Sequence, residues 1–388
     1  MDSPLFNFFQ IIILLGAGQG LFLAFVLFFL SKSNQRANRI LAFFLLFFSL
    51  NIGGIALYEL RLILAFPHLA LVYSSLALLF SPFIYFYVLA MTRPSFRLRS
   101  VHLLHGLPFL LFVSIHVPFF LQSAEAKKEW LLRSYEGMPA FQMTLLFATA
   151  VQAFFYLILC YRQLNRHERS VQEVYSDTER VNLRWLRYFL LGLVMVFGAC
   201  VLFSSVNAHA ADLASNLLFS VFVYIMAVYA LRQPAIFALD IWEPAREVIE
   251  IAASENAGAS PMANKYERST LPEHLVAPAL SRLQDLMEKE KIYQNPELKL
   301  TDLAAQLELS PHYLSQLLNI HVGENFYDFI NRRRVEEFKE SLNDPAKQHF
   351  NLLGLAYEAG FNSKAAFNNA FKKYTGMTPS EFRQGVSA

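Results

Sequence analysis

The sequence has little charge and little cysteine. Only 16% of its 388 residues are charged, against about 25% in an ordinary soluble domain, while 55% are hydrophobic. The two cysteines, Cys160 and Cys200, lie inside apolar runs and leave no pair for an extracellular disulfide framework. A net charge of +2 argues against a polybasic tail. Much of the chain is therefore expected to be solvated by something other than water.

Long uncharged runs fill the first 231 residues, and none occurs afterwards. Because a helix needs about 20 apolar residues to cross a bilayer, we predict seven spanning helices, at 8–30, 40–58, 69–91, 101–121, 141–161, 188–205 and 213–231. The first run lacks the basic start and the cleavage site of a signal peptide, so we expect it to stay in the mature protein. Three parts follow: a membrane domain over 1–232, a flexible cytoplasmic linker over 233–279 and a soluble domain over 280–388.

The basic residues predict the orientation of these spans. The odd-numbered connections between spans carry twelve Lys and Arg and the even-numbered ones carry four. Positive charge is retained on the cytoplasmic side. We therefore expect the N-terminus outside and everything after the last span in the cytoplasm.

The predicted spans contain no Asp, Glu, Lys or Arg, whereas pumps and transporters usually keep such groups at mid-membrane. Gly16, Gly18 and Gly20 are interpreted as close helix-packing positions. The predicted outer side collects five polar residues near helix ends, which are Glu59, His68, His116, His209 and Asp212. They could bind a metal, sense pH or line a pocket for a polar ligand, or simply face water at the interface.

From about residue 280 the chain contains an internal repeat with helical spacing. Measured from Ser310 and Ser363, apolar residues fall four, seven and eight positions later and a glycine falls thirteen positions later, in both copies. Ser310 can cap the helix of the first copy, and Ser363 or Asn362 can cap that of the second. Gly323 and Gly376 can end these helices. We predict two compact helix pairs joined by a longer helix over about 325–342.

A helix pair of this size is the helix-turn-helix, whose second helix can enter the major groove of DNA. A helical hairpin that docks a protein is the alternative. The outward residues of the two second helices are the candidate base-reading residues: His312, Tyr313, Ser315, Gln316, Lys364, Ala365, Asn368 and Asn369. Asn and Gln suit adenine edges, and Ala can touch a thymine methyl group.

Over about 280–383 the sequence resembles the AraC/XylS family of transcription regulators. The resemblance is densest in AYEAGFNSKAAFNNAFKKYTGMTPSEFR, residues 356–383. It implies two helix-turn-helix subdomains that read successive major-groove faces. It also places the base contacts on six of the residues above, which are His312, Ser315, Gln316, Lys364, Ala365 and Asn369. Two departures are Glu308, where a turn glycine is common, and Asn369, where an arginine is often found.

The soluble domain is not basic, since residues 280–388 contain 13 Lys and Arg and 14 Asp and Glu. Phosphate contacts must therefore come from local clusters, and we expect Arg332, Arg333, Arg334, Lys372 and Lys373 to supply them. DNA affinity should be modest and steeply salt-dependent, and a homodimer held by the membrane half could strengthen it.

These patterns together predict an all-α protein of the bacterial inner membrane that senses a small-molecule or envelope signal and binds double-stranded DNA. RNA polymerase is then an expected partner. The sequence contains no phosphate-binding loop or nucleophile elbow, so we expect no enzyme activity, cofactor or metal. The alternatives are a receptor or transporter whose tail docks a protein, and an enzyme that acts on lipid through the outer histidines.

Overall fold

The computed structural model describes residues 8–30, 34–93, 96–135, 140–178, 182–204, 271–347 and 349–386, with four single residues between 218 and 228. The chain divides into two compact units. The first contains 1–165 and 183–237, and the second contains 166–182 and 238–388. Within the described residues every regular element is a helix, as predicted for an all-α fold.

Among the residues that the structure describes, three apolar helical stretches are long enough to cross a membrane. They are Gln35–Glu59, Pro67–Thr92 and Thr144–Gln172, and two shorter apolar helices cover Ile13–Phe29 and Ser100–Ile115. Four predicted spans fall on single helices: α1 (Phe8–Phe29), α2 (Gln35–Glu59), α8 (Ala140–Gln172) and α9 (Arg184–Ser204). The predicted span 213–231 lies outside the described residues apart from four single positions.

The third and fourth predicted spans are built from shorter pieces than one helix each. Leu71 has a φ of +65° and separates the turns η1 and η2 from the helices after it. Pro108 and Pro118 stand in the first turns of the pieces in the fourth span, where a missing N–H costs no helical hydrogen bond. The pieces are η1 (Leu62–Ala65), η2 (Pro67–Leu69), α3 (Val72–Ser75), α4 (Ala77–Thr92), η3 (Ser100–Gly106), α5 (Leu107–Ile115) and α6 (Val117–Phe120).

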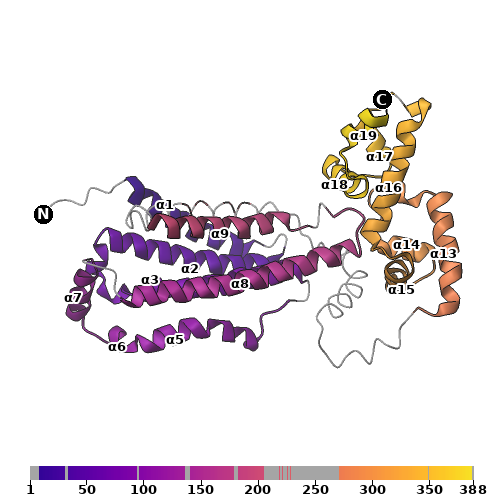
Figure 1. Ribbon diagram of the computed structural model, residues 1–388. Helices are drawn as coiled ribbons and strands as arrows, with labels where there is room; N and C mark the ends of the chain where they lie inside the picture. Colours follow the sequence, from indigo (N-terminus) through magenta and orange to yellow (C-terminus); the bar gives the residue numbers. More distant parts are fainter. Residues whose placement is uncertain are drawn as a thin grey trace. The chain divides into compact units, whose positions relative to one another are not determined.

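Within the first unit, helix α2 packs against α1 and also against α4 (α1 and α2 are labelled in Figure 1). A Cβ atom on Gly20 would collide with Ser49 Oγ, which confirms the predicted packing role of this glycine. A Cβ atom on Gly18 would meet no described atom within 4 Å, so Gly18 does not serve that role within the described residues. Near the end of α4, Gln163 of α8 accepts a hydrogen bond from Arg93 (2.8 Å) and donates one to Thr92 (2.9 Å).

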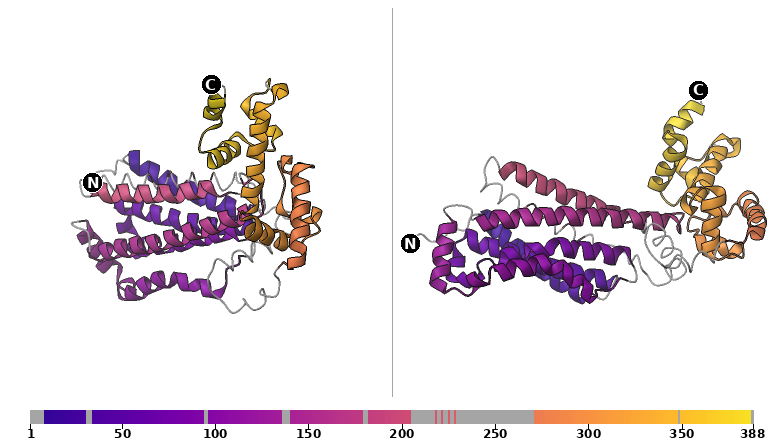
Figure 2. Two further views of the ribbon diagram at one scale, coloured as in Figure 1. Left: turned by 45° about the vertical axis from the view of Figure 1, so that its right-hand side comes forward. Right: turned by 60° about the horizontal axis from the view of Figure 1, so that its bottom comes forward.

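The second unit is organised around one long helix, α16 (Phe326–Asn343), which confirms the connecting helix predicted over 325–342. Helices α14 and α15 form the first helix pair, and α17 and α18 form the second (Figure 2). Helix α13 begins at Glu273, within the predicted linker, and it buries an apolar face that consists of Ala279, Leu283, Leu286 and Met287. The elements are α13 (Glu273–Glu288), η4 (Ile292–Gln294), α14 (Leu300–Gln306), α15 (Pro311–Gln316), the π-helical turn η5 (Leu317–Val322), η6 (Pro345–Lys347), α17 (Leu352–Glu358), α18 (Lys364–Thr375) and α19 (Pro379–Val386).

The predicted caps and stops of both helix pairs are confirmed. Ser310 Oγ accepts from the Tyr313 N–H (3.2 Å), and Ser363 Oγ accepts from the Ala366 N–H (3.0 Å). Each oxygen satisfies an amide that a helix start leaves free. Gly323 and Gly376 have φ values of +81° and +77°, the left-handed conformation that ends a helix.

The two helix pairs have different cores. Leucine dominates the first core, which includes Leu303, Leu314 and Leu318. Phenylalanine dominates the second core, whose rings belong to Phe338, Phe361, Phe367, Phe371 and Phe382. Aromatic rings bury more area per residue and prefer edge-on packing. In the second core, Phe367 and Phe371 of α18 pack against Phe338 of α16.

Candidate nucleic-acid interface

Helix α18, the second recognition helix, presents a continuous exposed polar face. Its buried residues, Phe367, Ala370 and Phe371, recur at the spacing of one helical face. The four predicted base-reading residues of this helix are all exposed on the other side: Lys364, Ala365, Asn368 and Asn369. This surface has the size and hydrogen-bonding chemistry that reading a major groove requires.

The first recognition helix, α15 with the turn η5, has a less accessible face. Its four predicted base-reading residues are only partly exposed: His312, Tyr313, Ser315 and Gln316. The Gln316 amide is engaged on both sides, since Oε1 accepts from the Leu271 N–H (2.9 Å) and Nε2 lies 3.0 Å from His312 Nε2. These side chains would have to exchange partners before they could contact bases.

A glutamate from a distant part of the chain also contacts this first face. Glu173 Oε2 accepts hydrogen bonds from Ser315 Oγ (3.3 Å) and Asn319 Nδ2 (2.9 Å). Neither Glu173 nor Asn319 is among the residues predicted from the sequence. Asn319 is exposed and lies one turn after Ser315, so helical spacing contained a signal for it. The contact with Glu173 joins residues 146 positions apart and has no local signal.

Buried hydrogen bonds to Ser176 hold this segment against the helical domain. Ser176 Oγ donates to the Leu298 carbonyl oxygen (2.7 Å) and accepts from Arg334 Nη2 (3.2 Å). The Ser176 carbonyl oxygen accepts from Asn331 Nδ2 (2.8 Å). Ser176 is 2% exposed, and the Leu300 N–H donates to the Val174 carbonyl oxygen (3.0 Å). The segment after α8 is therefore an integral part of the second unit.

The same segment reaches the turn of the second helix pair. Asp177 Oδ2 accepts a hydrogen bond from Asn362 Nδ2 (3.1 Å). Asn362 directly precedes the cap residue Ser363, and it was predicted as an alternative cap for α18. Ser363 takes that role, which leaves the Asn362 amide to bind Asp177.

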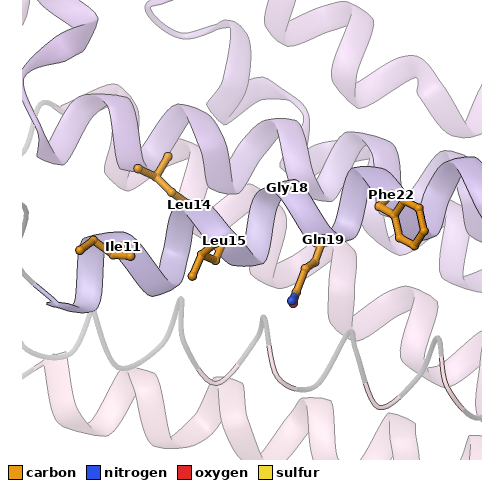
Figure 3. A pocket seen from close by; sticks show the side chains of 6 residues that line it. All are labelled: Ile11, Leu14, Leu15, Gly18, Gln19 and Phe22. Carbon is orange, nitrogen blue, oxygen red and sulfur yellow. The ribbon is translucent and has the colours of Figure 1, made fainter.

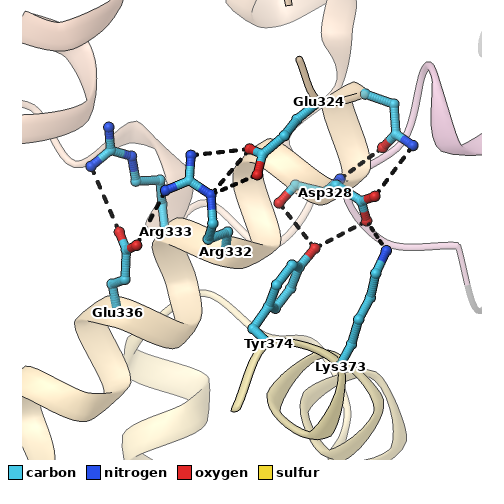
Figure 4. Close-up of polar contacts among 8 residues, drawn as sticks. Glu324, Asp328, Arg332, Arg333, Glu336, Lys373 and Tyr374 are labelled. Carbon is cyan, nitrogen blue, oxygen red and sulfur yellow. Dashed lines mark hydrogen bonds and ion pairs between the residues drawn. The ribbon is translucent and has the colours of Figure 1, made fainter. Parts of the chain in front are cut away.

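Two of the predicted phosphate-contacting arginines are engaged with carboxylates on the same helix or beside it (Figure 4). Arg332 Nε lies 2.9 Å from Glu324 Oε1, and Arg332 Nη1 lies 3.2 Å from Glu336 Oε1. The hydrogen bonds that Arg332 donates to the Glu324 carboxylate raise the pKa of its guanidinium. Arg333 Nη1 lies 3.7 Å from Glu336 Oε2. DNA phosphate would have to compete with these carboxylates.

The prediction that Arg334 contacts phosphate is wrong, because its side chain lies in the core rather than at the surface. It is 1% exposed, and it donates to the carbonyl oxygens of Tyr293 and Asn295, both at 2.7 Å. Burial lowers the pKa of its guanidinium to about 10, and the charge of Asp177 opposes that shift. A phosphate cannot reach this group while the domain is folded.

The lysines of α18 differ from each other. Lys373 Nζ lies 2.6 Å from Asp328 Oδ1, which also accepts from the Tyr374 hydroxyl (3.0 Å; Figure 4). Lys372 is exposed beside it. Among the five predicted phosphate contacts, Lys372 is the cation best placed to meet a backbone phosphate.

In the first unit, three of the five predicted signal-sensing residues are described. Glu59 ends α2, His68 lies in η2 and His116 separates α5 from α6. His68 Nδ1 lies 2.9 Å from the Nζ atom of Lys127, a 2% exposed lysine that the sequence analysis did not single out. His209 and Asp212 lie outside the described residues. Within the described part of the chain, no three His, Cys, Asp or Glu side chains are grouped to hold a metal.

A shallow apolar hollow lies along the exposed face of α1 (Figure 3). The lining residues that the structure describes all belong to α1, and they are Ile11, Leu14, Leu15, Gly18, Gln19 and Phe22. Gln19 is the one side chain among them that can form hydrogen bonds. An apolar helical face of this kind suits lipid tails or another apolar helix.

Comparison with known families places the polar face of α18 inside a recognised domain. Residues 303–385 match a helix-turn-helix domain. The C-terminal domain is of the AraC type. The match begins within α14 and ends within α19, so it contains both helix pairs and the connecting helix α16.

Curated relatives match about a quarter to a third of the chain. The uncharacterized transcriptional regulatory protein YesN of Bacillus subtilis is 36% identical over 99 residues, which are 24% of this chain and 26% of that protein. The regulatory protein PocR of Salmonella typhimurium is 26% identical over 125 residues, 32% of this chain and 38% of its own. The transcriptional regulatory protein HptR of Staphylococcus aureus is 30% identical over 95 residues, which are 24% of this chain and 36% of that protein.

The matches therefore span well under half of these relatives' own length. The relatives are named as regulatory proteins, which agrees with the expectation that this chain is not an enzyme. No solved structure matches the chain.

Proposed function

We propose that this protein is a one-component transcription regulator of the bacterial inner membrane, in which an apolar membrane half senses a signal and the C-terminal domain binds DNA. One observation carries the proposal. The exposed polar face of α18 belongs to an AraC-type helix-turn-helix domain, in a chain that also contains three helical stretches of membrane-crossing length. One polypeptide thus contains both a membrane element and a DNA-reading element.

The two recognition helices would read successive major-groove faces of one duplex. Lys364, Ala365, Asn368 and Asn369 supply the base contacts of α18. His312, Tyr313, Ser315 and Gln316 supply those of α15, once their present partners are exchanged. Lys372 contacts phosphate directly, whereas Arg332, Arg333 and Lys373 do so only on leaving their carboxylate partners.

Seven spans, with the N-terminus outside and the C-terminal domain in the cytoplasm, remain part of this proposal. The position of residues 166–182 supports the orientation. This connection carries basic residues that predict a cytoplasmic location, and it folds into one unit with the C-terminal domain. Both segments must then lie on the same side of the membrane.

The signal would change the relative placement of two C-terminal domains in a homodimer, and with it their fit to half-sites about 34 Å apart. RNA polymerase is the partner through which DNA binding would alter transcription. The outer residues Glu59, His68, His116, His209 and Asp212 are the proposed sensing positions.

The DNA-binding function is tested with the full chain in lipid nanodiscs and a pool of random DNA duplexes at two salt concentrations. The proposal expects bound duplexes to share a sequence motif, and it expects Asn369→Ala to change that motif. A folded chain that recovers no motif at either salt would instead favour the reading in which the tail docks a protein.

The sensing positions are tested by replacing His68, His116 and His209 together with alanine and following a reporter gene under the recovered motif. The proposal expects the reporter to lose its response to envelope conditions while the chain still binds DNA. An unchanged response would remove the outer histidines from the sensing site. Solute uptake into vesicles by a chain cut after Pro234 would favour a transporter.

A further inference from the structure

The segment that follows α8 joins the predicted membrane half to both helix pairs of the DNA-binding domain. Helix α8 runs without a break from Ala140 to Gln172, and its stretch Thr144–Gln172 is one of the three candidate spans. Residues 173–177 come directly after it. Any movement of this helix would therefore be passed through the covalent chain to the segment that contacts the recognition surface.

The segment contacts each helix pair through one carboxylate. Glu173 accepts from Ser315 and Asn319, which lie on successive turns of the first recognition helix. Asp177 accepts from Asn362, in the turn before the second recognition helix. DNA presents negative phosphates and base-edge acceptors to the same amides and hydroxyls. A carboxylate on Ser315 and Asn319 therefore occupies donors that DNA would need, and it repels an approaching phosphate.

The contact is firmly anchored between these two carboxylates. Val174 and Ser176 are 1% and 2% exposed, and Ser176 exchanges three hydrogen bonds with Leu298, Asn331 and Arg334. Buried polar groups that lose such partners are costly to leave unpaired, so the segment should leave the domain as a unit or not at all. A surface loop in passing contact would lack this buried anchor.

We propose that residues 173–177 form an acidic clamp that covers the first recognition helix and competes with DNA for it. This inference rests on the proposed DNA-binding function. In the clamped state α18 is free to contact DNA, whereas α15 is blocked. Displacement of Glu173 releases Ser315 and Asn319, so both helix pairs can engage. The membrane signal would act by moving the end of α8 and so weakening the clamp.

The first test measures the affinity of the full chain in nanodiscs for the duplex that the wild-type chain selects from a random pool. Glu173→Ala removes the competing carboxylate, so we expect binding about fivefold tighter, the equivalent of one net hydrogen bond. Glu173→Gln keeps an acceptor without the charge and should fall between the two. Exposed Glu340 in α16 supplies the matched control, because Glu340→Gln removes the same charge outside the clamp.

Equal affinity of Glu173→Ala and the wild type would overturn the clamp while leaving DNA binding intact. The same gain in Glu340→Gln as in Glu173→Gln would also overturn it, because a general charge effect would then explain the result. If neither chain selects a duplex, the DNA-binding function itself fails and the clamp fails with it. These outcomes separate the two proposals.

The second test detects the contact directly. Cysteines replace Glu173 and Asn319 in a chain whose Cys160 and Cys200 are changed to alanine, and a short bismaleimide joins them in nanodiscs. We expect cross-linking in the pair, none in the single-cysteine controls, and a decrease as the selected duplex saturates the protein. Cross-linking that is absent, or that persists unchanged with saturating duplex, would contradict competition between the clamp and DNA.

Discussion

The two helix pairs of the C-terminal domain have the same backbone plan but different surroundings. Both second helices begin at a capping serine and end at a left-handed glycine. The face of α18 is exposed, whereas the face of α15 is partly covered by Glu173 and Leu271. A repeat in sequence thus specifies the same local fold twice without specifying the same availability. The copy whose donors are already occupied is the one suited to control.

The turns of the two pairs differ in the same way. Helices α14 and α17 are each followed by a residue in the left-handed conformation, Glu308 (φ +55°) in the first turn and Gly360 (φ +97°) in the second. A side chain costs energy in that conformation and glycine does not. The first turn therefore carries backbone strain that the second avoids.

The largest expected effect is that of Gly360→Ala. A Cβ atom there would lie 2.5 Å from the Tyr293 carbonyl oxygen, which is backbone and cannot step aside, and its φ is unfavourable for alanine. We expect a loss of roughly 3 kcal/mol or more in the free energy of unfolding of the C-terminal domain. The free energy is measured by unfolding the full chain with urea in detergent. Susceptibility of the C-terminal domain to proteolysis reports the unfolded fraction at each urea concentration.

Gly376→Ala is the matched control for that substitution. Gly376 has a similar φ but no atom within 4 Å of the added Cβ, so about 1 kcal/mol should be lost. Equal losses at the two glycines would show that the turn of the second pair is not packed against η4.

Specificity should depend more on α18 than on α15 in the wild-type chain. Asn369→Ala removes an exposed amide, so we expect discrimination at its base pair to fall by about 1–3 kcal/mol. Gln316→Ala should have a smaller effect, because the Gln316 amide is already bound to His312 and Leu271. Motifs recovered from random duplexes by each variant provide the comparison.

The clamp makes that comparison sharper. In a Glu173→Ala chain Ser315 is released, and Ser315→Ala should then change the motif more than it does in the wild type. Identical motif changes for Ser315→Ala in both chains would mean that Glu173 does not restrict α15.

Glu308→Gly should stabilise the domain. Glycine adopts the left-handed conformation without the penalty that Glu308 bears, so we expect a gain of about 1 kcal/mol in the free energy of unfolding. The sign is opposite to that of Gly360→Ala at the equivalent turn position. The same urea experiment measures it, and a destabilised Glu308→Gly chain would show that the glutamate side chain makes a contact worth more than the strain.

The smallest expected effect distinguishes two neighbouring lysines. Lys372→Ala removes an exposed cation and should weaken binding to all sequences alike. The negative slope of log binding constant against log salt concentration should become less steep by about one. Lys373→Ala should change the slope less, because Asp328 already neutralises Lys373. Affinities for one duplex over a series of salt concentrations test this, and equal slopes for both variants would mean that DNA displaces Asp328.

Local patterns predicted the helix pairs and α16, because caps, glycine stops and apolar spacing are properties of neighbouring residues. The position of Arg334 was predictable and was missed. It is spaced four residues from both Ile330 and Phe338, two buried residues of α16, so helical geometry turns it inward while Arg332 and Arg333 stay partly exposed. A run of three arginines therefore does not make a three-arginine surface patch.

Other features had no local signal. The contacts of Glu173, Ser176 and Asp177 with the C-terminal domain join residues more than 120 positions apart, and only the folded chain brings them together. Prolines at 108 and 118 marked breaks in an apolar run, but hydropathy alone treats that run as one span. Apolar length predicts that a segment can cross a membrane and not how many pieces it contains.

The most direct test of the account is the recovery of DNA by the full-length wild-type chain in nanodiscs from random duplexes at two salt concentrations. The account predicts an enriched motif at the lower salt, weaker recovery at the higher salt and a changed motif with Asn369→Ala. Recovery of duplexes with no shared sequence, by a chain shown to be folded and in its native oligomeric state, would contradict it.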